Sequence, residues 1–242
     1  MEFNEVGLFR GEDYQVNEYI TIHHPTLKEI FDYGEQEYWN TSSIICATPS
    51  DLKHQLFDTY GLYFNEVDEF DLFCMLAGGF DKEKIKIFFG GLDFSKLYIR
   101  ENEKTGLREI FDKDSGLVID KVIYTIITEY IRRINGLKKN LETAGNEIAR
   151  KMLIEESRRN YMHNQNKPFK PMLLPMVLTM VNCADFKYNY SNVWDMPIYS
   201  FLDSVKRIMH MKNVGYTMLG VYTGNIMADK LDKKDLDWFS EI

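Results

Sequence analysis

The sequence predicts an α+β protein that is predominantly helical, with an N-terminal strand and a small antiparallel β-meander. Three observations predict this class. Most apolar residues recur at helical spacing, in segments that open on Pro, Asp or Thr and close on glycine. Residues 14–23 are instead alternating and rich in Tyr, Ile, Val and Thr. Residues 96–119 hold short β-prone runs separated by glycine-containing turns.

The N-terminal half is expected to be a strand followed by helices. Residues 14–23 are predicted as the strand, and Pro25-Thr26 opens a helix that runs to about Ala47, with Gly34 as its weak point. A second start signal at residues 48–51 precedes a helix that closes near Gly61. Two more helices are predicted from about Asp68 to Gly78 and around residues 85–89.

The remaining elements follow from turn signals and periodicity. Strands are predicted at residues 96–100, 107–111 and 117–119, and Asp120 is expected to cap a helix over residues 121–134. Helices are then predicted over residues 143–163, 172–181 and 198–222. The core positions expected for the last helix are Phe201, Leu202, Val205, Ile208 and Met209.

We expect one domain over residues 1–242. An alternative is a division into an N-terminal strand and helical lobe (1–92), the meander (93–119) and a C-terminal helical lobe (120–242). Neither a repeat nor a low-complexity linker favours separate domains.

The charge balance disfavours nucleic acid as a partner. The chain has 242 residues and a formal net charge of -8, and nucleic-acid affinity depends largely on neutralising phosphates. Its basic pairs stand close to acids, which favours a solvated, salt-bridged helix surface. These pairs are Arg132-Arg133, Lys138-Lys139, Arg150-Lys151 and Arg158-Arg159.

The cysteines and the hydropathy predict a cytoplasmic protein without a membrane partner. Cys46, Cys74 and Cys183 are odd in number and far apart in the sequence, which favours reduced thiols over disulfides. The first residues lack the features of a secretion signal, and no apolar run approaches the roughly 20 residues of a membrane span.

The motifs that resemble chemistry are each better explained by structure. His23 and His24 are adjacent on a predicted strand, so their side chains point to opposite faces and are poorly placed to chelate one ion. Residues 112–116 resemble the start of a calcium loop but lack its glycine spacing and final Glu, and a β-turn explains them. Gly78-Gly79 and Gly90-Gly91 are explained as helix ends. We therefore predict no metal, no cofactor, no catalytic residue and no enzyme activity.

Two aromatic clusters are candidate partner-binding sites. Trp194, Met196, Tyr199 and Phe201 fall within one short segment, and such a density of aromatics and Met is typical of interface anchors. Core packing is the alternative reading of that segment. Trp238 and Phe239 form the second cluster, near the C-terminal end of the sequence.

Three segments carry a resemblance to phage proteins. They are residues 20–30 (ITIHHPTLKEI), 46–53 (CATPSDLK) and 193–207 (VWDMPIYSFLDSVKR). Together they resemble uncharacterised proteins encoded among the structural genes of tailed bacteriophages. The strand that leads into a "Pro-Thr-Leu-x-Glu-Ile" helix also resembles phage tail assembly chaperones. That resemblance implies a non-enzymatic protein that coats the tape-measure protein through hydrophobic contacts in the host cytoplasm.

Other functions fit the same sequence. One is a structural component of the virion, such as a neck, connector or baseplate protein, whose location would be the particle. Another is a phage enzyme or host-directed inhibitor with a site assembled from distant residues. The expected partners are the tape-measure protein or another tail protein, and a homo-oligomer is a further alternative.

Overall fold

The computed structural model describes residues 3–103, 105–227, 229, 231–232 and 236–239. It confirms the predominantly helical α+β class, with ten α-helices and two small antiparallel sheets in this part of the chain. The helices are α1 (Glu5–Arg10), α2 (Leu27–Tyr33), α3 (Glu35–Ile45), α4 (Lys53–Tyr60), α5 (Glu69–Ala77), α6 (Lys82–Phe89), α7 (Lys121–Asn135), α8 (Glu147–Asn164), α9 (Leu173–Val181) and α10 (Ile198–Tyr222). The strands are β1 (Tyr14–Gln15), β2 (Thr21–Ile22), β3 (Tyr98–Glu101), β4 (Arg108–Phe111) and β5 (Val118–Ile119).

The predicted N-terminal strand is wrong as a single element. Residues 14–23 form a short hairpin instead, in which β1 pairs antiparallel with β2. The Asn17 side chain closes the turn, because its Oδ1 accepts hydrogen bonds from the backbone N–H groups of Tyr19 (2.9 Å) and Ile20 (2.8 Å). Asparagine forms such turns readily, and this local preference overrides the alternating pattern.

The helix predicted from Pro25 to Ala47 is two helices. Gly34 has φ of +103°, a conformation that L side chains rarely adopt, so α2 ends and α3 begins at this residue. The start of α2 is a capping box in which the Thr26 backbone N–H donates to Glu29 Oε2 at 2.8 Å. The predicted weak point is therefore the boundary between two helices.

The meander and the helix after it are confirmed. The sheet has the order β3-β4-β5, and Asp112 closes its second turn by accepting a hydrogen bond from the backbone N–H of Asp114 at 3.1 Å. The Asp120 side chain caps α7 by accepting from the backbone N–H of Ile123 at 2.8 Å. Helix α7 then supplies buried residues to the main core, among them Ile127 and Ile131.

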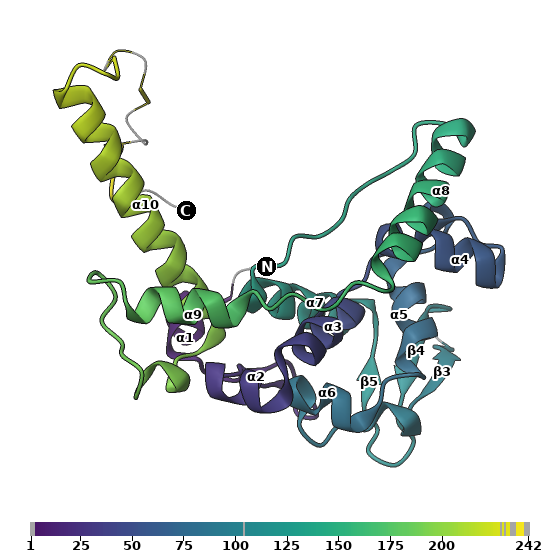
Figure 1. Ribbon diagram of the computed structural model, residues 1–242. Coiled ribbons are helices and arrows are strands. Elements are labelled where there is room, and N and C mark those ends of the chain that lie inside the picture. Colours follow the sequence, from purple (N-terminus) through teal and green to yellow (C-terminus); the bar gives the residue numbers. More distant parts are fainter. Residues whose placement is uncertain (1–2, 104, 228, 230, 233–235, 240–242) are drawn as a thin grey trace.

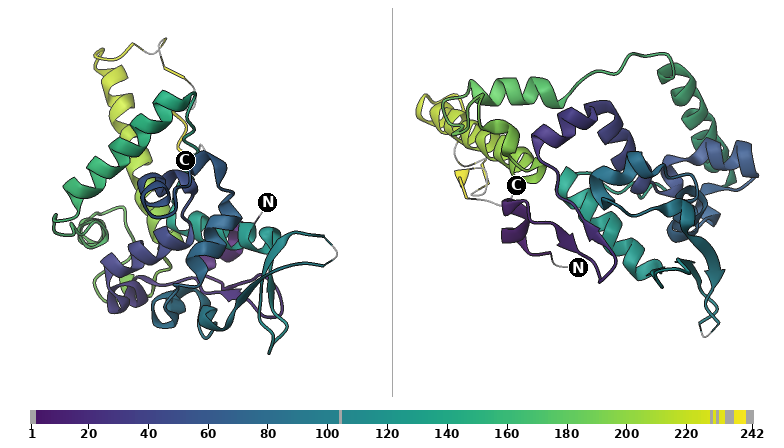
Figure 2. Two further views of the ribbon diagram at one scale, coloured as in Figure 1. Left: turned by 90° about the vertical axis from the view of Figure 1, so that its right-hand side faces the viewer. Right: turned by 90° about the horizontal axis from the view of Figure 1, so that it is seen from below.

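Two helices rise from the body of the molecule on opposite sides (Figure 1). Helix α8 packs against α4, and Ile154 is its buried contact residue. The base of α10 packs against α7 and α1, while the rest of α10 extends away from the body (Figures 1 and 2).

The C-terminal segment is attached to the N-terminal half through backbone hydrogen bonds. The Leu27 N–H donates to the Met196 carbonyl at 2.9 Å, and the Ile198 N–H donates to the Pro25 carbonyl at 3.0 Å. Thr26 and Pro197 form an isolated antiparallel bridge between them. The division into lobes at residues 92 and 119 stays a prediction.

Candidate protein-binding surface

The first half of α10 is docked on the body of the molecule. Ile198 and Phe201 are fully buried, and three further apolar residues of the helix are partly buried against the same core. These three are Leu202, Val205 and Ile208. They recur at three- and four-residue spacing, so they form one stripe along the helix. The sequence-predicted core positions are confirmed up to Ile208.

Polar contacts fix the position of this docked half. The Tyr199 hydroxyl donates to Glu5 Oε2 at 3.0 Å, and the Ser200 hydroxyl donates to the Phe9 carbonyl at 2.6 Å. Both acceptors lie on α1, which the docked half of α10 therefore covers. The base of α10 has little freedom to move relative to the body.

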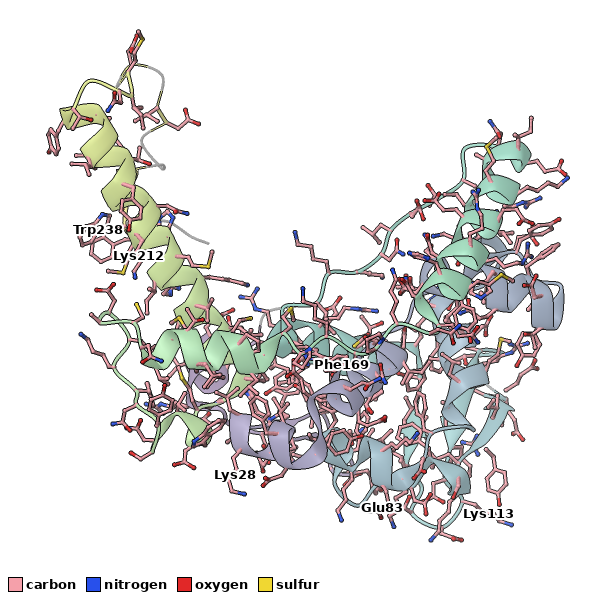
Figure 3. The ribbon with its side chains drawn as sticks, viewed as in Figure 1. Lys28, Glu83, Lys113, Phe169, Lys212 and Trp238 are labelled. Atoms are coloured by element: carbon pink, nitrogen blue, oxygen red, sulfur yellow. The ribbon has the colours of Figure 1, made fainter. Side chains whose placement is uncertain are left out.

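The second half of α10 carries the same stripe but nothing in the described chain covers it. Its four most exposed large apolar side chains are Met209 (59% exposed), Tyr216 (70%), Leu219 (58%) and Tyr222 (78%), whereas Val214 is buried (2%). Their spacing of seven, three and three residues places them on the side of the helix that continues the docked stripe. We call these four residues the arm stripe. The projecting part of α10 that carries them is visible with its side chains in Figure 3.

Met209 was expected in the core and is instead exposed. The expectation followed from its helical spacing after Val205, which is correct. Met209 lies on a side of α10 that no part of the described chain covers, whereas Val214, farther along the same helix, is buried (2% exposed). The helical spacing of Met209 was predicted correctly. The sequence did not show that this side of α10 lies outside the core.

The projecting part of α10 has very little charge. Between Ile208 and Met227 the sequence contains one charged residue, Lys212. An exposed helix ordinarily keeps charged residues on its solvent face, and helix α8 does so with several Glu, Arg and Lys residues. A contiguous exposed apolar surface marks an interaction site in many proteins.

The predicted anchor segment is part of the chain's own core. Met196 (4% exposed) and Phe201 are buried. The Trp194 ring meets the Phe31 ring edge-on at 5.6 Å, and its Nε1 donates to the Tyr190 carbonyl at 2.8 Å. The ring of the fourth predicted residue, Tyr199, contacts Phe9 at 5.1 Å. Core packing, the alternative left open by the sequence, therefore describes this segment.

The second predicted cluster lies on the surface beside α10. Trp238 is 53% exposed and Phe239 is 91% exposed. Asp237 lies beside α10, since His210 Nε2 is 2.9 Å from the Asp237 carbonyl oxygen. Figure 3 labels Trp238 near this helix. Trp238 and Phe239 directly follow Asp237 in the sequence and are exposed to solvent.

His23 and the basic pairs have intramolecular partners. His23 lies between two carboxylates, with Nδ1 2.8 Å from Asp13 and Nε2 3.1 Å from Glu29. Among the described residues, no group of three or more His, Cys, Asp or Glu side chains has the arrangement of a metal site. Each of the four basic pairs contains at least one residue that forms an ion pair with an acid. These ion pairs are Arg133–Glu5, Lys139–Glu69, Arg150–Glu66 and Arg158–Asp58.

Two clefts flank the C-terminal end of α7. One, of about 840 Å³, has Glu5, Arg133 and Tyr199 in its wall, where the Arg133 guanidinium and the Tyr199 hydroxyl both contact the Glu5 carboxylate. The other, of about 860 Å³, is lined by Cys46 and Arg132 among others. Burial raises the pKa of the Cys46 thiol to about 12, so this cysteine is protonated at neutral pH.

The comparisons with known proteins bear on the C-terminal part of the chain. Residues 164–242 match the family described as YomV second domain, a phage-derived family. This similarity points to a phage protein. No curated protein and no solved structure shows significant similarity to the chain.

The segment similar to the YomV second domain contains α9, α10 and Asp237, which contacts α10. The arm stripe therefore lies entirely within it, and so do the predicted residues Trp238 and Phe239. The sequence signal that could have identified the arm stripe is the continuation of the apolar period beyond Met209 without intervening acidic residues. None of the helices in the described part of the chain combines the length and apolarity of a membrane span.

Proposed function

We propose that this chain is a non-enzymatic phage protein that acts by binding another protein through the arm stripe. One observation carries the proposal: four large apolar side chains stay exposed on one side of the projecting part of α10, which has one charged residue, Lys212. Burying each such side chain contributes about 1.5–3 kcal/mol. A partner that covers the stripe therefore gains a substantial stabilisation from it.

The stripe also defines the chemistry of the partner. A helix surface with residues at three-, four- and seven-residue spacing is recognised by another amphipathic helix or by an apolar groove. Lys212, the one charged residue of the projecting part, requires no acidic partner surface because its Nζ already lies 3.6 Å from Asp185. The partner surface is expected to be apolar.

Tail assembly is the setting that the sequence resemblance supports. In that setting the partner is the tape-measure protein, which tail assembly chaperones coat through hydrophobic contacts. The similarity to a phage-derived family agrees with a phage setting at a coarser level.

The Cys46 thiol at the larger cleft supports a non-enzymatic role. Catalytic nucleophiles need a lowered pKa or an adjacent base, whereas the pKa of Cys46 at the larger cleft is raised. Of the side chains whose pKa departs most from its usual range, Tyr38, Tyr124, Tyr130 and His24 are buried in the core. Burial is the largest cause of each of these shifts, so they do not identify an acid–base pair.

Co-expression with the tape-measure protein tests the proposal. The wild-type chain is expected to keep that protein in solution and to be recovered with it in a pull-down. The double substitution Tyr216→Glu and Leu219→Glu places two carboxylates in the stripe and should abolish recovery. The matched control, Ile148→Glu with Met152→Glu, alters two equally exposed apolar residues on α8 (69% and 65%) and should leave recovery unchanged. Equal recovery with the stripe variant would overturn the proposal.

A structural role in the virion is the second candidate. The apolar character of the stripe favours it, because permanent interfaces are more apolar than transient ones. Quantitative mass spectrometry of purified particles separates the two roles. A structural component is present in fixed copy number, whereas an assembly chaperone is absent from mature particles.

A further inference from the structure

Strand β3 forms one edge of the three-stranded sheet, because β4 is its neighbour in the order β3-β4-β5 (Figure 1). All four of its residues are exposed, so no part of the described chain covers this edge. Tyr98 and Ile99 are 64% and 55% exposed and point to opposite faces of the strand. An uncovered edge of this kind is a template on which another strand can pair.

The hydrogen bonds of the hairpin show which backbone groups are free at this edge. The Asn102 N–H donates to the Leu107 carbonyl at 2.8 Å, so this pair is hydrogen-bonded. Hydrogen-bonded and non-hydrogen-bonded pairs alternate along an antiparallel ladder, so Arg100 also directs its backbone groups toward β4. The N–H and carbonyl groups of Ile99 and Glu101 therefore point away from β4, and no described residue bonds to them. They match the spacing at which another extended strand presents its own acceptors and donors.

We infer that the free edge of β3 binds an extended segment of another protein, which adds a fourth strand antiparallel to β3. The segment carries a β-branched apolar residue opposite Ile99 and a Lys or Arg residue opposite Glu101. Main-chain hydrogen bonds hold such a strand in place, and the side chains at alternate positions select it. This surface is distinct from the arm stripe, so the inference goes beyond the proposed function.

The side chains beside the free edge define the chemistry of the partner strand. Ile99 lies opposite Ile110, which is buried in the main core, so Ile99 points to the core side of the sheet. Glu101 is two residues farther along and shares that face. Its carboxylate forms no ion pair among the described residues, whereas Arg100, on the other face, is already paired with Glu109 at 2.6 Å. An apolar residue and a cation two positions apart would complement Ile99 and Glu101.

A second copy of β3 does not provide this complement. In an antiparallel pair of two β3 strands, residues whose backbone groups point outward lie opposite one another. Around this edge the residues of that parity are Ser95, Leu97, Ile99, Glu101 and Glu103. None of them is a cation, so every register leaves Glu101 without an opposite charge.

The peptide Ser-Thr-Lys-Thr-Val-Thr-Ser tests the inference with the purified full chain. Paired antiparallel to β3, its lysine lies opposite Glu101 and its valine opposite Ile99. At millimolar peptide, amide exchange measured by NMR should slow at Ile99 and Glu101 and stay unchanged at Arg100, whose N–H already bonds to β4. A peptide with Glu in place of Lys should bind more than about fivefold more weakly, since an opposite-charge pair becomes a like-charge pair. Unchanged exchange at Ile99 and Glu101 would overturn the inference.

Variants of the chain locate the binding at the strand edge. Glu101→Lys should reverse the preference between the two peptides. Ile99→Pro removes an outward N–H but no hydrogen bond to β4, and should abolish binding, whereas Ile99→Ala keeps that N–H and should retain part of it. Thermal unfolding checks that each variant is folded, and the charge reversal decides the matter if the proline variant is not.

Other binding modes give different results. The variant with Tyr216→Glu and Leu219→Glu should bind the peptide as the wild-type chain does, so a loss there would assign the peptide to the arm stripe and overturn the inference. Retention of the wild-type preference by Glu101→Lys would also overturn it. Sedimentation covers the remaining occupant: a wild-type dimer that Ile99→Pro dissociates would assign the edge to a second copy instead.

Discussion

The Glu35 carboxylate caps helix α9 by accepting a hydrogen bond from the backbone N–H of Leu173, at 2.6 Å from Oε1. The same carboxylate accepts from the N–H groups of Met172 (2.7 Å) and Leu174 (3.4 Å). Helix α9 has no side-chain cap of its own, and Pro175 in its first turn lacks an N–H. Glu35, on α3, therefore satisfies the free donors of a helix that lies far along the chain.

Replacing Glu35 with alanine is expected to destabilise the fold by about 1–2 kcal/mol, the usual cost of losing a helix cap. Urea unfolding measures the loss, and hydrogen exchange of the amides of residues 172–174 should accelerate. Glu37→Ala, two residues along the same helix and exposed, is the control. Unchanged exchange at these three amides in Glu35→Ala would show that the carboxylate does not cap α9.

His24 makes the stability depend on pH. Its side chain is 1% exposed, neither ring nitrogen has a hydrogen-bond partner among the described residues, and burial lowers its pKa from 6.5 to about 4, with a smaller contribution from His23. The unfolded chain therefore binds the proton more tightly than the folded chain. The stability due to neutral His24 is complete above about pH 6.5 and is lost as the pH falls toward about 4.

A leucine at position 24 should remove part of this pH dependence. Between pH 7 and pH 5 the wild-type chain is expected to lose about 2 kcal/mol more unfolding free energy than His24→Leu, on the basis of proton linkage. Chemical unfolding at both pH values measures the difference. The exposed His163→Leu variant should keep the wild-type dependence. The same loss in His24→Leu and in the wild-type chain would contradict this account.

Gly11 and Pro197 determine how closely α1 approaches the base of α10. Gly11 has φ of +70°, and a Cβ atom there would lie 2.4 Å from Pro197 Cγ. Gly11→Ala combines the left-handed backbone cost with this overlap and should destabilise the fold by about 3 kcal/mol. Gly61 has φ of +67° with open space around it, so Gly61→Ala should cost only about 1 kcal/mol. If thermal unfolding showed the same loss of stability in Gly11→Ala and Gly61→Ala, the contact between Gly11 and Pro197 would not be tight.

Cys183 should be the most reactive of the three thiols. A hydrogen bond from the Asp185 backbone lowers its pKa, and the Lys212 ammonium, 3.2 Å from the sulfur, lowers it further. Burial raises the pKa of both Cys46 and Cys74. Iodoacetamide labelling followed by peptide mass spectrometry is therefore expected to modify Cys183 first, and Lys212→Met should slow that reaction. Faster labelling of Cys46 or Cys74 in the folded chain would contradict the prediction.

Local signals explain why most elements could be predicted from the sequence. Asp68 and Asp120 cap α5 and α7 as expected, and Gly61 ends α4, because caps and stops depend on residues adjacent in the chain. The hairpin at residues 14–22 was missed because the turn preference of Asn17 was outweighed by the alternation around it.

The features that were missed depend on tertiary position. The contact of Glu35 with α9 joins two helices that no sequence period relates. The exposure of Met209 depends on which side of α10 the rest of the chain covers, which its apolar spacing does not reveal. The aromatic segment around Phe201 has the composition of an interface, and the interface that it forms is with the chain's own core. Trp238 and Phe239 as partner-binding residues stay a prediction.

Hydrogen exchange of the chain alone and in its complex with the tape-measure protein tests the central claim most directly. The four residues of the arm stripe are exposed in the free chain, so packing gives this side of α10 little protection. Partner binding through the arm stripe predicts that exchange slows across residues 209–222 and stays unchanged on α8. Protection confined to α8 or to the clefts beside α7, with residues 209–222 exchanging as in the free chain, would contradict the account.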